Sequence, residues 1–140
     1  MLKRSGFKKK KTVPMKRTPL KKVSSLGSLQ RKCDALLSPI VVNSYSKCLL
    51  CGKLSQVAHH FVHKSKSNAL RYNMWNLIPL CHSCHFALHN NESLYAARII
   101  LANGVAWFEE LEQLKRETIK VNRKHYEEVY QRLLTLKEKL

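Results

Sequence analysis

Four cysteines between residues 48 and 84 have the spacing of a metal site. They form two pairs, Cys48 with Cys51 and Cys81 with Cys84, and each pair is separated by two residues. Zinc prefers four tetrahedral nitrogen or sulfur ligands, and two such turns can supply two thiolates each. Metal ligation is also the usual role of such pairs in a chain without a secretory signal. The spacing therefore predicts one structural Zn²⁺ on these four cysteines.

Six of the seven histidines lie between residues 59 and 89, and this zinc needs none of them. His85 and His89 are four residues apart in a predicted helix, so they share a face and can bind one ion. His59 is a third candidate ligand, which leaves coordination positions open for water and phosphate. His60 could take a proton from that water, because imidazole titrates near neutral pH. Asn76 could lock the intervening loop by side-chain-to-backbone hydrogen bonds and so aim His60.

Other uses of these residues stay open. Two mixed zinc sites without any catalysis would use Cys81, Cys84, His85 and His89 for one ion, and Cys48, Cys51, His59 and His63 for the other. A C₂H₂ finger on the second set is excluded by length, because only seven residues separate its two halves against the usual dozen. Cys33, the fifth cysteine, has no feature that marks it as a nucleophile. His63 and His82 are interpreted as phosphate-facing or supporting groups.

Short elements are predicted around these residues. Residues 57–63 favour a strand, residues 65–76 a polar loop, residues 77–80 a short apolar segment, and residues 81–89 a helix. In a flat strand, neighbouring side chains point to opposite faces. The strand must therefore end or bend near His59 and His60 if both are to serve one site.

Helices are predicted on both sides of this region. Residues 33–42 favour a short helix that breaks near Pro39. Residues 92–103 favour a helix that Gly104 ends, followed by a helix over residues 105–115. Residues 123–140 carry apolar side chains at helical spacing. This stripe is expected to pack on the domain core, with a homodimer through the C-terminal helix as the alternative.

The charge of +17 is concentrated in the first part of the chain. Residues 1–91 contain 17 Lys and Arg but a single acid, Asp34, which excludes a two-carboxylate glycosidase site or an all-carboxylate metal site there. Such a basic chain favours a polyanionic partner, and DNA is the leading candidate. The expected nucleic-acid contacts are Lys8, Lys9, Lys10, Lys11, Lys16, Arg17, Lys21, Lys22, Lys64, Lys66 and Arg71.

Residues 1–30 are predicted to be a basic, flexible arm, because they offer too little apolar surface to offset the entropy of ordering. A solubilising tail is the alternative to a phosphate-binding arm. No apolar segment suggests a secretory signal or a membrane span. We therefore expect a cytoplasmic location, which is the host cytoplasm if a phage encodes the chain.

The cysteine pairs, the His59-His60 dipeptide, the segment from Asn76 to His85, and His89 together resemble the HNH endonuclease family over residues 45–92. This resemblance implies an α+β fold with a zinc-stapled ββα-metal, treble-clef-like core. It implies that His59, His85 and His89 bind one catalytic divalent ion, with Mg²⁺ or Mn²⁺ expected. It also implies that His60 is the general base and Asn76 the residue that orients the loop.

A broader resemblance covers most of the chain. The basic arm, the residues near Arg71, the Gly104 turn and the terminal helix look like small phage recombination endonucleases of the NinG (Rap) type. The predicted organisation is an arm over residues 1–30, a nuclease core over residues 31–91 and a helical extension packed on that core over residues 92–140. The function implied is a metal-dependent DNA endonuclease acting on branched or recombination intermediates of a phage. The alternatives are a non-catalytic zinc-stapled nucleic-acid-binding module and an HNH nuclease of restriction, homing or packaging type that acts on plain duplex.

Overall fold

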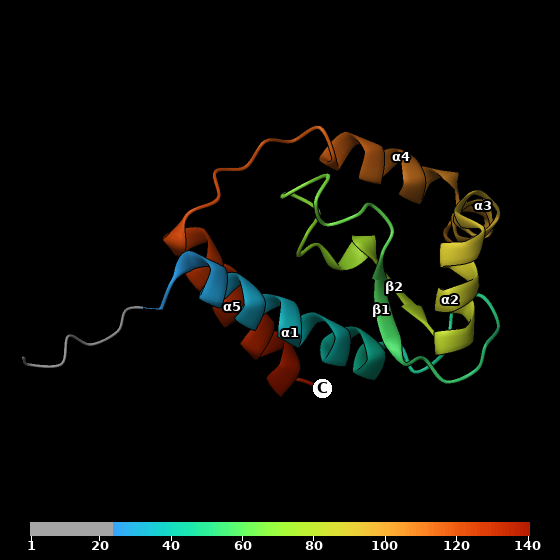
Figure 1. The fold of residues 1–140 in the computed structure, drawn as a ribbon, viewed down its shortest axis with the longest axis horizontal. Helices are drawn as coiled ribbons and strands as arrows, with labels where there is room; N and C mark the ends of the chain where they lie inside the picture. Colours follow the sequence, from blue (N-terminus) through green and yellow to red (C-terminus); the bar gives the residue numbers. More distant parts are fainter. Residues whose placement is uncertain (1–23) are drawn as a thin grey trace, which may run out of the picture.

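The computed structural model describes residues 24–140, which form an α+β fold as predicted (Figure 1). Within these residues, five helices surround a two-stranded antiparallel sheet. In chain order, the elements are α1 (Leu26–Ser44), β1 (Val57–His60), a short 3₁₀-helix η1 (Met74–Asn76), β2 (Leu77–Leu80), α2 (His82–Asn90), α3 (Glu92–Asn103), α4 (Val105–Leu114) and α5 (Arg123–Glu138). The predicted arm falls largely outside the described residues.

Helices α1 and α5, far apart in the sequence, pack side by side (Figure 1). The buried stripe of α1 consists of Leu29, Cys33, Leu37, Ile40 and Val41. It meets a buried stripe of α5 formed by Tyr126, Val129 and Leu133. The expectation that the C-terminal stripe packs on the core is therefore confirmed.

The first helix corrects two predictions. It begins at Leu26, where the side chain of Ser25 caps it by accepting a hydrogen bond from the Ser28 amide, so residues 26–30 are not part of an unfolded arm. It also continues through Pro39 to Ser44 without a break. A proline inside a helix costs about 3 kcal/mol. Burial of Leu37, Ile40 and Val41 on both sides of Pro39 offsets this cost, because each side chain contributes about 1.5–3 kcal/mol.

The hairpin of β1 and β2 has one face towards α1 and another towards α2. Val57 pairs with Leu80, and His59 pairs with Ile78. Val57, Ile78 and Leu80 belong to a second core with Leu88 of α2 and Ile99 of α3. On the other face, Ala58 and Leu77 pack in the core between α1 and α5. Side chains alternate between the two faces of the sheet, so strands of only four residues separate two cores.

The helices after the hairpin follow the predicted bounds closely. Helix α2 begins one residue after Cys81 and extends to Asn90, and α3 spans the predicted residues. Gly104 has a φ of 94°, a conformation that favours glycine, and it separates α3 from α4. Among residues 24–140, no helix combines the length and apolar character needed to cross a bilayer.

Candidate nuclease site

Three histidines from two elements converge beside the hairpin. His85 and His89 are one turn apart on α2, and their Nε2 atoms are 3.2 Å from each other. The His59 ring, from β1, has its centroid 5.4 Å from that of His85 and 5.9 Å from that of His89. One nitrogen from each ring lies within 4.8 Å of the others. The structure therefore brings together the three residues predicted to bind one ion.

The chemistry of this histidine cluster fits a divalent ion. Burial, together with the charges that His85 and His89 would carry, lowers the pKa of His59 to about 4. Burial also lowers the pKa of His85, followed by the effect of His89. Two of the three rings are therefore neutral near pH 7, the form in which imidazole binds metal. Three nitrogen donors leave coordination positions open, as a catalytic ion requires.

His60 lies next to this cluster in the chain but contacts a different partner. Its Nε2 atom is 2.9 Å from the backbone carbonyl oxygen of Arg71. A carbonyl can only accept, so Nε2 must carry the hydrogen and Nδ1 of the neutral ring keeps its lone pair. Burial lowers the pKa of His60, although the Arg71 carbonyl opposes this shift. His60 is therefore a neutral imidazole with one nitrogen able to accept a proton.

Asn76 is fully buried at the start of β2 and holds the loop that follows β1. Its Oδ1 accepts a hydrogen bond of 2.7 Å from the Val62 amide. Its Nδ2 donates to the carbonyl oxygens of Val62 and Leu70, at 2.9 and 3.1 Å. These are the side-chain-to-backbone bonds expected of a loop-locking asparagine. Leu70 directly precedes Arg71, so the same bonds restrain the segment that contacts His60.

A four-cysteine cluster lies at the other end of the hairpin. The sulfurs of Cys48, Cys51, Cys81 and Cys84 all lie within 4.8 Å of one another. The Sγ atoms of Cys51 and Cys81 are 3.6 Å apart. Tetrahedral zinc with Zn–S bonds of about 2.3 Å would place its sulfurs about 3.8 Å apart. The donor set therefore fits a structural Zn²⁺, and the alternative of two mixed Cys/His sites does not form.

Local backbone geometry places each cysteine pair. Cys48 and Cys51 flank a turn in which the Gly52 amide donates to the Cys48 carbonyl at 2.9 Å, with a φ of 72° at Gly52. Cys81 caps α2, and its Sγ accepts from the Cys84 amide at 3.4 Å. This amide hydrogen bond is the main cause that lowers the pKa of Cys81 to about 7. A thiolate, the form that binds zinc, is thus favoured at the helix start.

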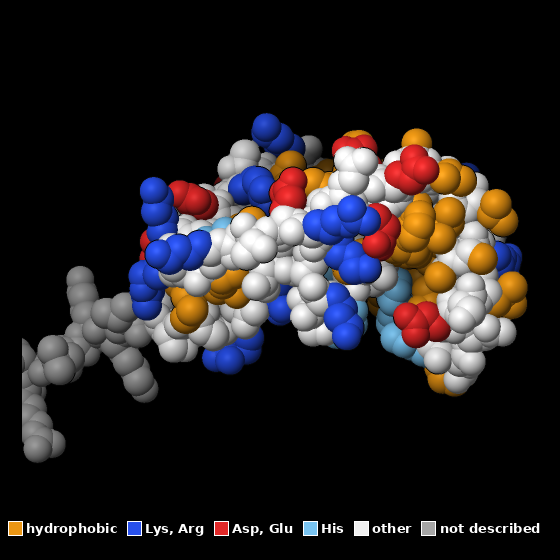
Figure 2. Space-filling model, turned by 90° about the horizontal axis from the view of Figure 1, so that it is seen from above, with side chains coloured by type: hydrophobic (Ala, Val, Ile, Leu, Met, Phe, Trp, Pro, Cys, Tyr) orange, Lys and Arg blue, Asp and Glu red, His pale blue; other side chains and the backbone are white. Residues whose placement is uncertain are grey.

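A cleft of about 830 Å³ opens beside the histidines. His59, His60 and His89 line it, together with two lysines, Lys66 and Lys115, and two acids, Glu92 and Glu112. Figure 2 shows histidine side chains along a hollow between a surface rich in Lys and Arg and one with more hydrophobic and acidic side chains. The cleft is open enough for an extended anionic chain to reach the histidines.

Helix α4 forms a wall of this region. Phe61, which directly follows β1, packs edge-on against Trp107 and Phe108 with ring centroids 4.9 and 6.1 Å apart. The Trp107 indole donates to the Trp75 carbonyl at 3.0 Å. Because Trp75 precedes Asn76, this bond ties α4 to the segment that holds the loop. The helical extension therefore supports the candidate site.

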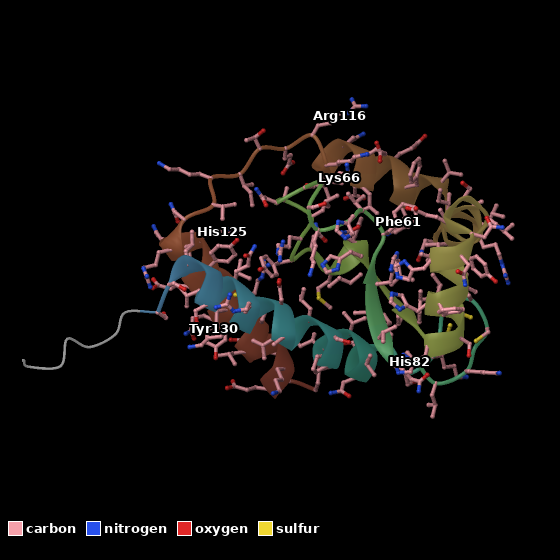
Figure 3. The ribbon with its side chains drawn as sticks, viewed as in Figure 1. Phe61, Lys66, His82, Arg116, His125 and Tyr130 are labelled. Carbon is pink, nitrogen blue, oxygen red and sulfur yellow. The ribbon has the colours of Figure 1, made fainter. Side chains whose placement is uncertain are left out.

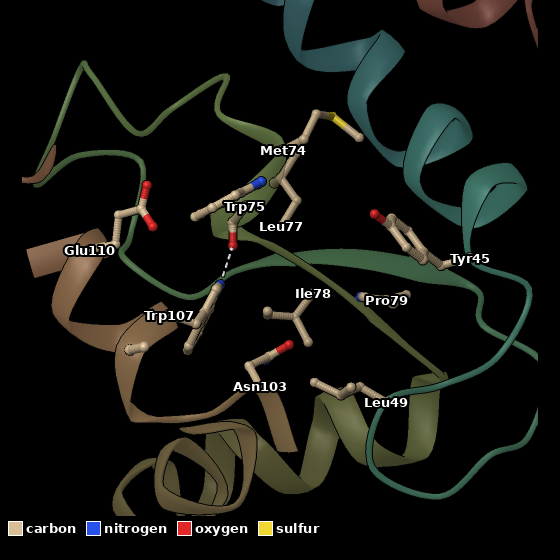
Figure 4. Close-up of a pocket in the computed structure, with 11 residues that line it drawn as sticks. Tyr45, Leu49, Met74, Trp75, Leu77, Ile78, Pro79, Asn103, Trp107 and Glu110 are labelled. Carbon is tan, nitrogen blue, oxygen red and sulfur yellow. Dashed lines mark hydrogen bonds between the residues drawn. The ribbon is translucent and has the colours of Figure 1, made fainter. Parts of the chain in front are cut away.

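A second cavity, of about 420 Å³, lies by β2 (Figure 4). Trp75 and Trp107, which are joined by the hydrogen bond described above, both line it. Apolar and aromatic side chains dominate its wall, with Tyr45 and Met74 among them. Glu110 is the single charged side chain in its lining, and neither histidine nor cysteine takes part. Of the histidines predicted to act on phosphate, His59, His60 and His89 line the larger cleft instead.

The predicted basic contacts have different environments. Eight of them, from Lys8 to Lys22, lie outside the described residues. Lys64 and Lys66 are exposed on the loop after β1, and Figure 3 shows Lys66 near Phe61 at the end of that loop closer to α4. Arg71 instead forms an ion pair with Asp34, and its side chain is only 12% exposed. Its surroundings thus give Arg71 a role within the fold, which does not support the expectation that it binds phosphate.

Sequence reasoning did not find the partners of Arg71. Asp34 and Tyr72 surround its guanidinium, and both come from regions to which no function had been assigned. One signal was visible, because Asp34 is the single acid among the first 91 residues. Its partner was not visible, because 37 positions separate Asp34 from Arg71.

Comparison with known proteins gives one family. The family model described as Bacteriophage Lambda NinG protein matches residues 3–140, which is nearly the whole chain. Neither the curated proteins nor the solved structures compared with the chain gave a match. The match includes the cysteine cluster, the histidine cluster and all the helices described above. The chain belongs to the NinG family of phage proteins.

Proposed function

We propose that this NinG-family protein is a metal-dependent endonuclease of the HNH type that hydrolyses DNA phosphodiester bonds. The observation that carries the proposal is the convergence of His59, His85 and His89, next to a cleft that His59, His60 and His89 line. A module that only binds DNA would not need a neutral histidine such as His60, held in one tautomer next to three histidines that can bind a metal ion. The order of the elements, a two-stranded hairpin followed by α2, supports this proposal, because it is the order expected of a ββα-metal core.

In this proposal, His60 acts as the general base. Its Nδ1 atom accepts a proton from the water that attacks the phosphorus atom, while Nε2 stays bound to the Arg71 carbonyl. A divalent ion held by the histidine cluster would stabilise the charge that develops on the phosphate and on the leaving oxygen. Asn76 keeps the loop in place and so holds His60 at a fixed angle to the cleft.

The identity of the ion follows from its donors. Mg²⁺ prefers oxygen ligands, whereas imidazole nitrogen suits transition-metal ions. Of the two ions expected from the sequence, the three histidines favour Mn²⁺, and Ni²⁺ or Zn²⁺ should also bind. Zinc at the four cysteines holds the hairpin to α2 and takes no part in the reaction.

The substrate proposal is branched DNA, such as recombination intermediates of a phage. It is supported by membership of the NinG family and by the resemblance of the chain to small phage recombination endonucleases. DNA is the proposed partner, contacted by the basic arm, Lys64 and Lys66. A homodimer through α5 stays a prediction, and any such contact must use surface that the packing on α1 leaves exposed.

A cleavage panel tests this function. Full-length protein is incubated with duplex, single-stranded, flap, D-loop and four-way-junction DNA, in Mg²⁺, Mn²⁺, Ni²⁺, Zn²⁺ or EDTA. We expect cleavage of the branched substrates that requires a divalent ion and is lost in His85→Ala and His89→Ala. His125→Ala is the control, because His125 is a histidine of α5 outside the cluster.

Each outcome of the panel discriminates between functions. Cleavage of plain duplex at the same rate would favour a restriction, homing or packaging type of nuclease. Binding without cleavage in every ion would favour the zinc-stapled binding module and overturn the proposal.

A further inference from the structure

Both oxygens of the Asp34 carboxylate, on α1, accept hydrogen bonds from the loop between β1 and β2. The donors are Arg71 and Tyr72. Its Oδ1 accepts from Arg71 Nε at 3.1 Å, and its Oδ2 accepts from Arg71 Nη2 at 2.6 Å. The Tyr72 hydroxyl also donates to Oδ1, at 2.9 Å. A two-point pairing of this kind fixes the orientation of the guanidinium as well as its position.

A second helix holds the same segment from the other side. Arg132, on α5, donates to the Tyr72 carbonyl at 3.1 Å. The peptide unit between Arg71 and Tyr72 is therefore held to α1 by the side chains on both of its ends, and the next peptide unit is held to α5 through the Tyr72 carbonyl. Both helices belong to the larger core, so their positions relative to each other are fixed by packing.

The peptide unit between Arg71 and Tyr72 carries the carbonyl oxygen that accepts the hydrogen bond from His60 Nε2. We propose that Asp34 is a positioning residue for His60: by fixing Arg71, it keeps that carbonyl in place and so holds the imidazole in the tautomer with a free Nδ1. The inference rests on the proposed function, in which His60 is the base. It assigns the only acidic side chain of residues 1–91 a part in the reaction without any contact with DNA or metal.

The pair is suited to this task because it is partly shielded from water. The side chains of Asp34 and Arg71 are 26% and 12% exposed, so solvent screens them less than a surface pair. Burial opposes the charge on Asp34, but the hydrogen bonds from Arg71 and Tyr72 outweigh it and lower the pKa of the carboxyl group. The carboxylate therefore stays ionised, and the guanidinium stays oriented, at neutral pH.

Asp34→Asn is the direct test, made in the full-length, zinc-loaded protein. The loss of one charged acceptor should lower kcat about 10- to 100-fold, the usual effect of removing a supporting hydrogen bond next to a reactive histidine. KM should stay unchanged, because Asp34 contacts no substrate. Glu127→Gln is the matched control, since it breaks an exposed ion pair with Arg123 on α5 and should leave kcat unchanged.

A spectroscopic readout separates positioning from general destabilisation. Nitrogen-15 NMR of the His60 ring should show a single tautomer with the hydrogen on Nε2 in the wild type. Asp34→Asn should show a mixture of tautomers, with zinc content and melting cooperativity retained. Wild-type tautomer or wild-type kcat in this variant would overturn the inference.

Arg71→Lys provides a second route if Asp34→Asn does not fold. Lysine keeps the charge but cannot reproduce the two-point contact, so kcat should fall with KM unchanged. A wild-type kcat in a folded Arg71→Lys protein would overturn the inference. Failure of the proposed function looks different: the wild type would cleave no DNA, while the His60 tautomer would still depend on Asp34.

Discussion

His59 and His60 are consecutive residues whose rings contact partners on opposite faces of the hairpin. His59 meets His85 and His89 of α2, whereas His60 bonds to the Arg71 carbonyl, next to α1. Both side chains still line the same cleft, because β1 ends at His60. The strand end predicted from the sequence is therefore present. One dipeptide supplies both a candidate metal ligand, His59, and the proposed general base, His60.

Replacement of His60 should abolish chemistry without loss of structure. His60→Ala should reduce kcat by about 10²- to 10⁴-fold, the usual contribution of a general base. Zinc content and DNA affinity should stay at wild-type values, because His60 belongs to neither metal cluster. His125→Ala on α5 is the control (Figure 3). Single-turnover cleavage measures the effect, and more than a tenth of wild-type activity in His60→Ala would contradict the assignment.

Loss of zinc should unfold the smaller core. Cys48 and Cys81 are buried there with Leu80, Leu88 and Ile99. Zinc binding of about 10–16 kcal/mol in small structural sites is comparable to the whole stability of a domain. Cys48→Ser and Cys81→Ser should therefore lose cooperative melting, and metal analysis of the wild type should find about one tightly bound zinc per chain.

Cys33 supplies the control for these cysteine variants. It is fully buried but lies in the other core, against α5. Cys33→Ala should cost about 1 kcal/mol and keep the zinc. A protein without all four clustered thiols that still melted cooperatively would refute the zinc assignment.

The Asp34–Arg71 pair should make stability depend on acid pH. The pKa of Asp34 is lower in the folded protein than its ordinary value of 3.8. Its contribution is therefore complete above that value and disappears as the pH falls below it towards the folded pKa. Asp34→Asn should melt at a lower temperature than the wild type near pH 6, and the two melting temperatures should converge as the pH falls below 3.8. A constant difference between the two proteins across this range would contradict the predicted linkage.

The basic arm can be removed without damage to α1 if the cut is placed by the structure. Ser25 caps α1 and the Ser24 carbonyl accepts from Arg123, so the deletion should end at residue 22. Residues 1–22 contain ten Lys and Arg. If about six phosphates are engaged, the slope of log K against log salt should be near −5 for the full chain on duplex DNA and flatter for the truncated one.

The arm should not read sequence or shape, because phosphate contacts carry no sequence information. Its deletion should weaken binding to all substrates alike, with single-turnover cleavage at saturating enzyme nearly unchanged. A scrambled arm of the same composition should restore binding. Equal salt slopes with and without the arm would identify a solubilising tail, and loss of junction preference alone would identify a shape reader.

Local spacing was enough to predict the two metal clusters and the helices around them. Two residues between the cysteines of a pair form a turn, a spacing of four positions from His85 to His89 makes one helical turn, and Gly104 permits a positive φ. These relations depend on neighbours in the chain, so a sequence contains them directly. The hydrogen bonds of Asn76 follow the same logic, because they close a loop of 14 residues within one segment.

Long-range packing could not be predicted in the same way. The rule that proline breaks helices failed at Pro39, because burial against α5, far along the chain, supports the helix on both sides. Arg71 was expected to contact DNA because it is basic, but Asp34 lies beside it only after α1 has packed on the hairpin. The unbroken helix and the pairing of Arg71 with Asp34 both depend on tertiary contacts, which can outweigh a local preference.

The pairing of α1 with α5 also sets the order in which the molecule can be completed during translation. The apolar stripe of α1 leaves the ribosome before its partners Tyr126, Val129 and Leu133, because the hairpin and helices α2 to α4 lie between them in the chain. Arg132, which holds the Tyr72 carbonyl, arrives with them. Contacts between such distant segments form late, because the chain between them must first be ordered. A nascent chain therefore carries its histidines before it can fix them, and the proposed activity requires that α5 has been made and has packed on α1.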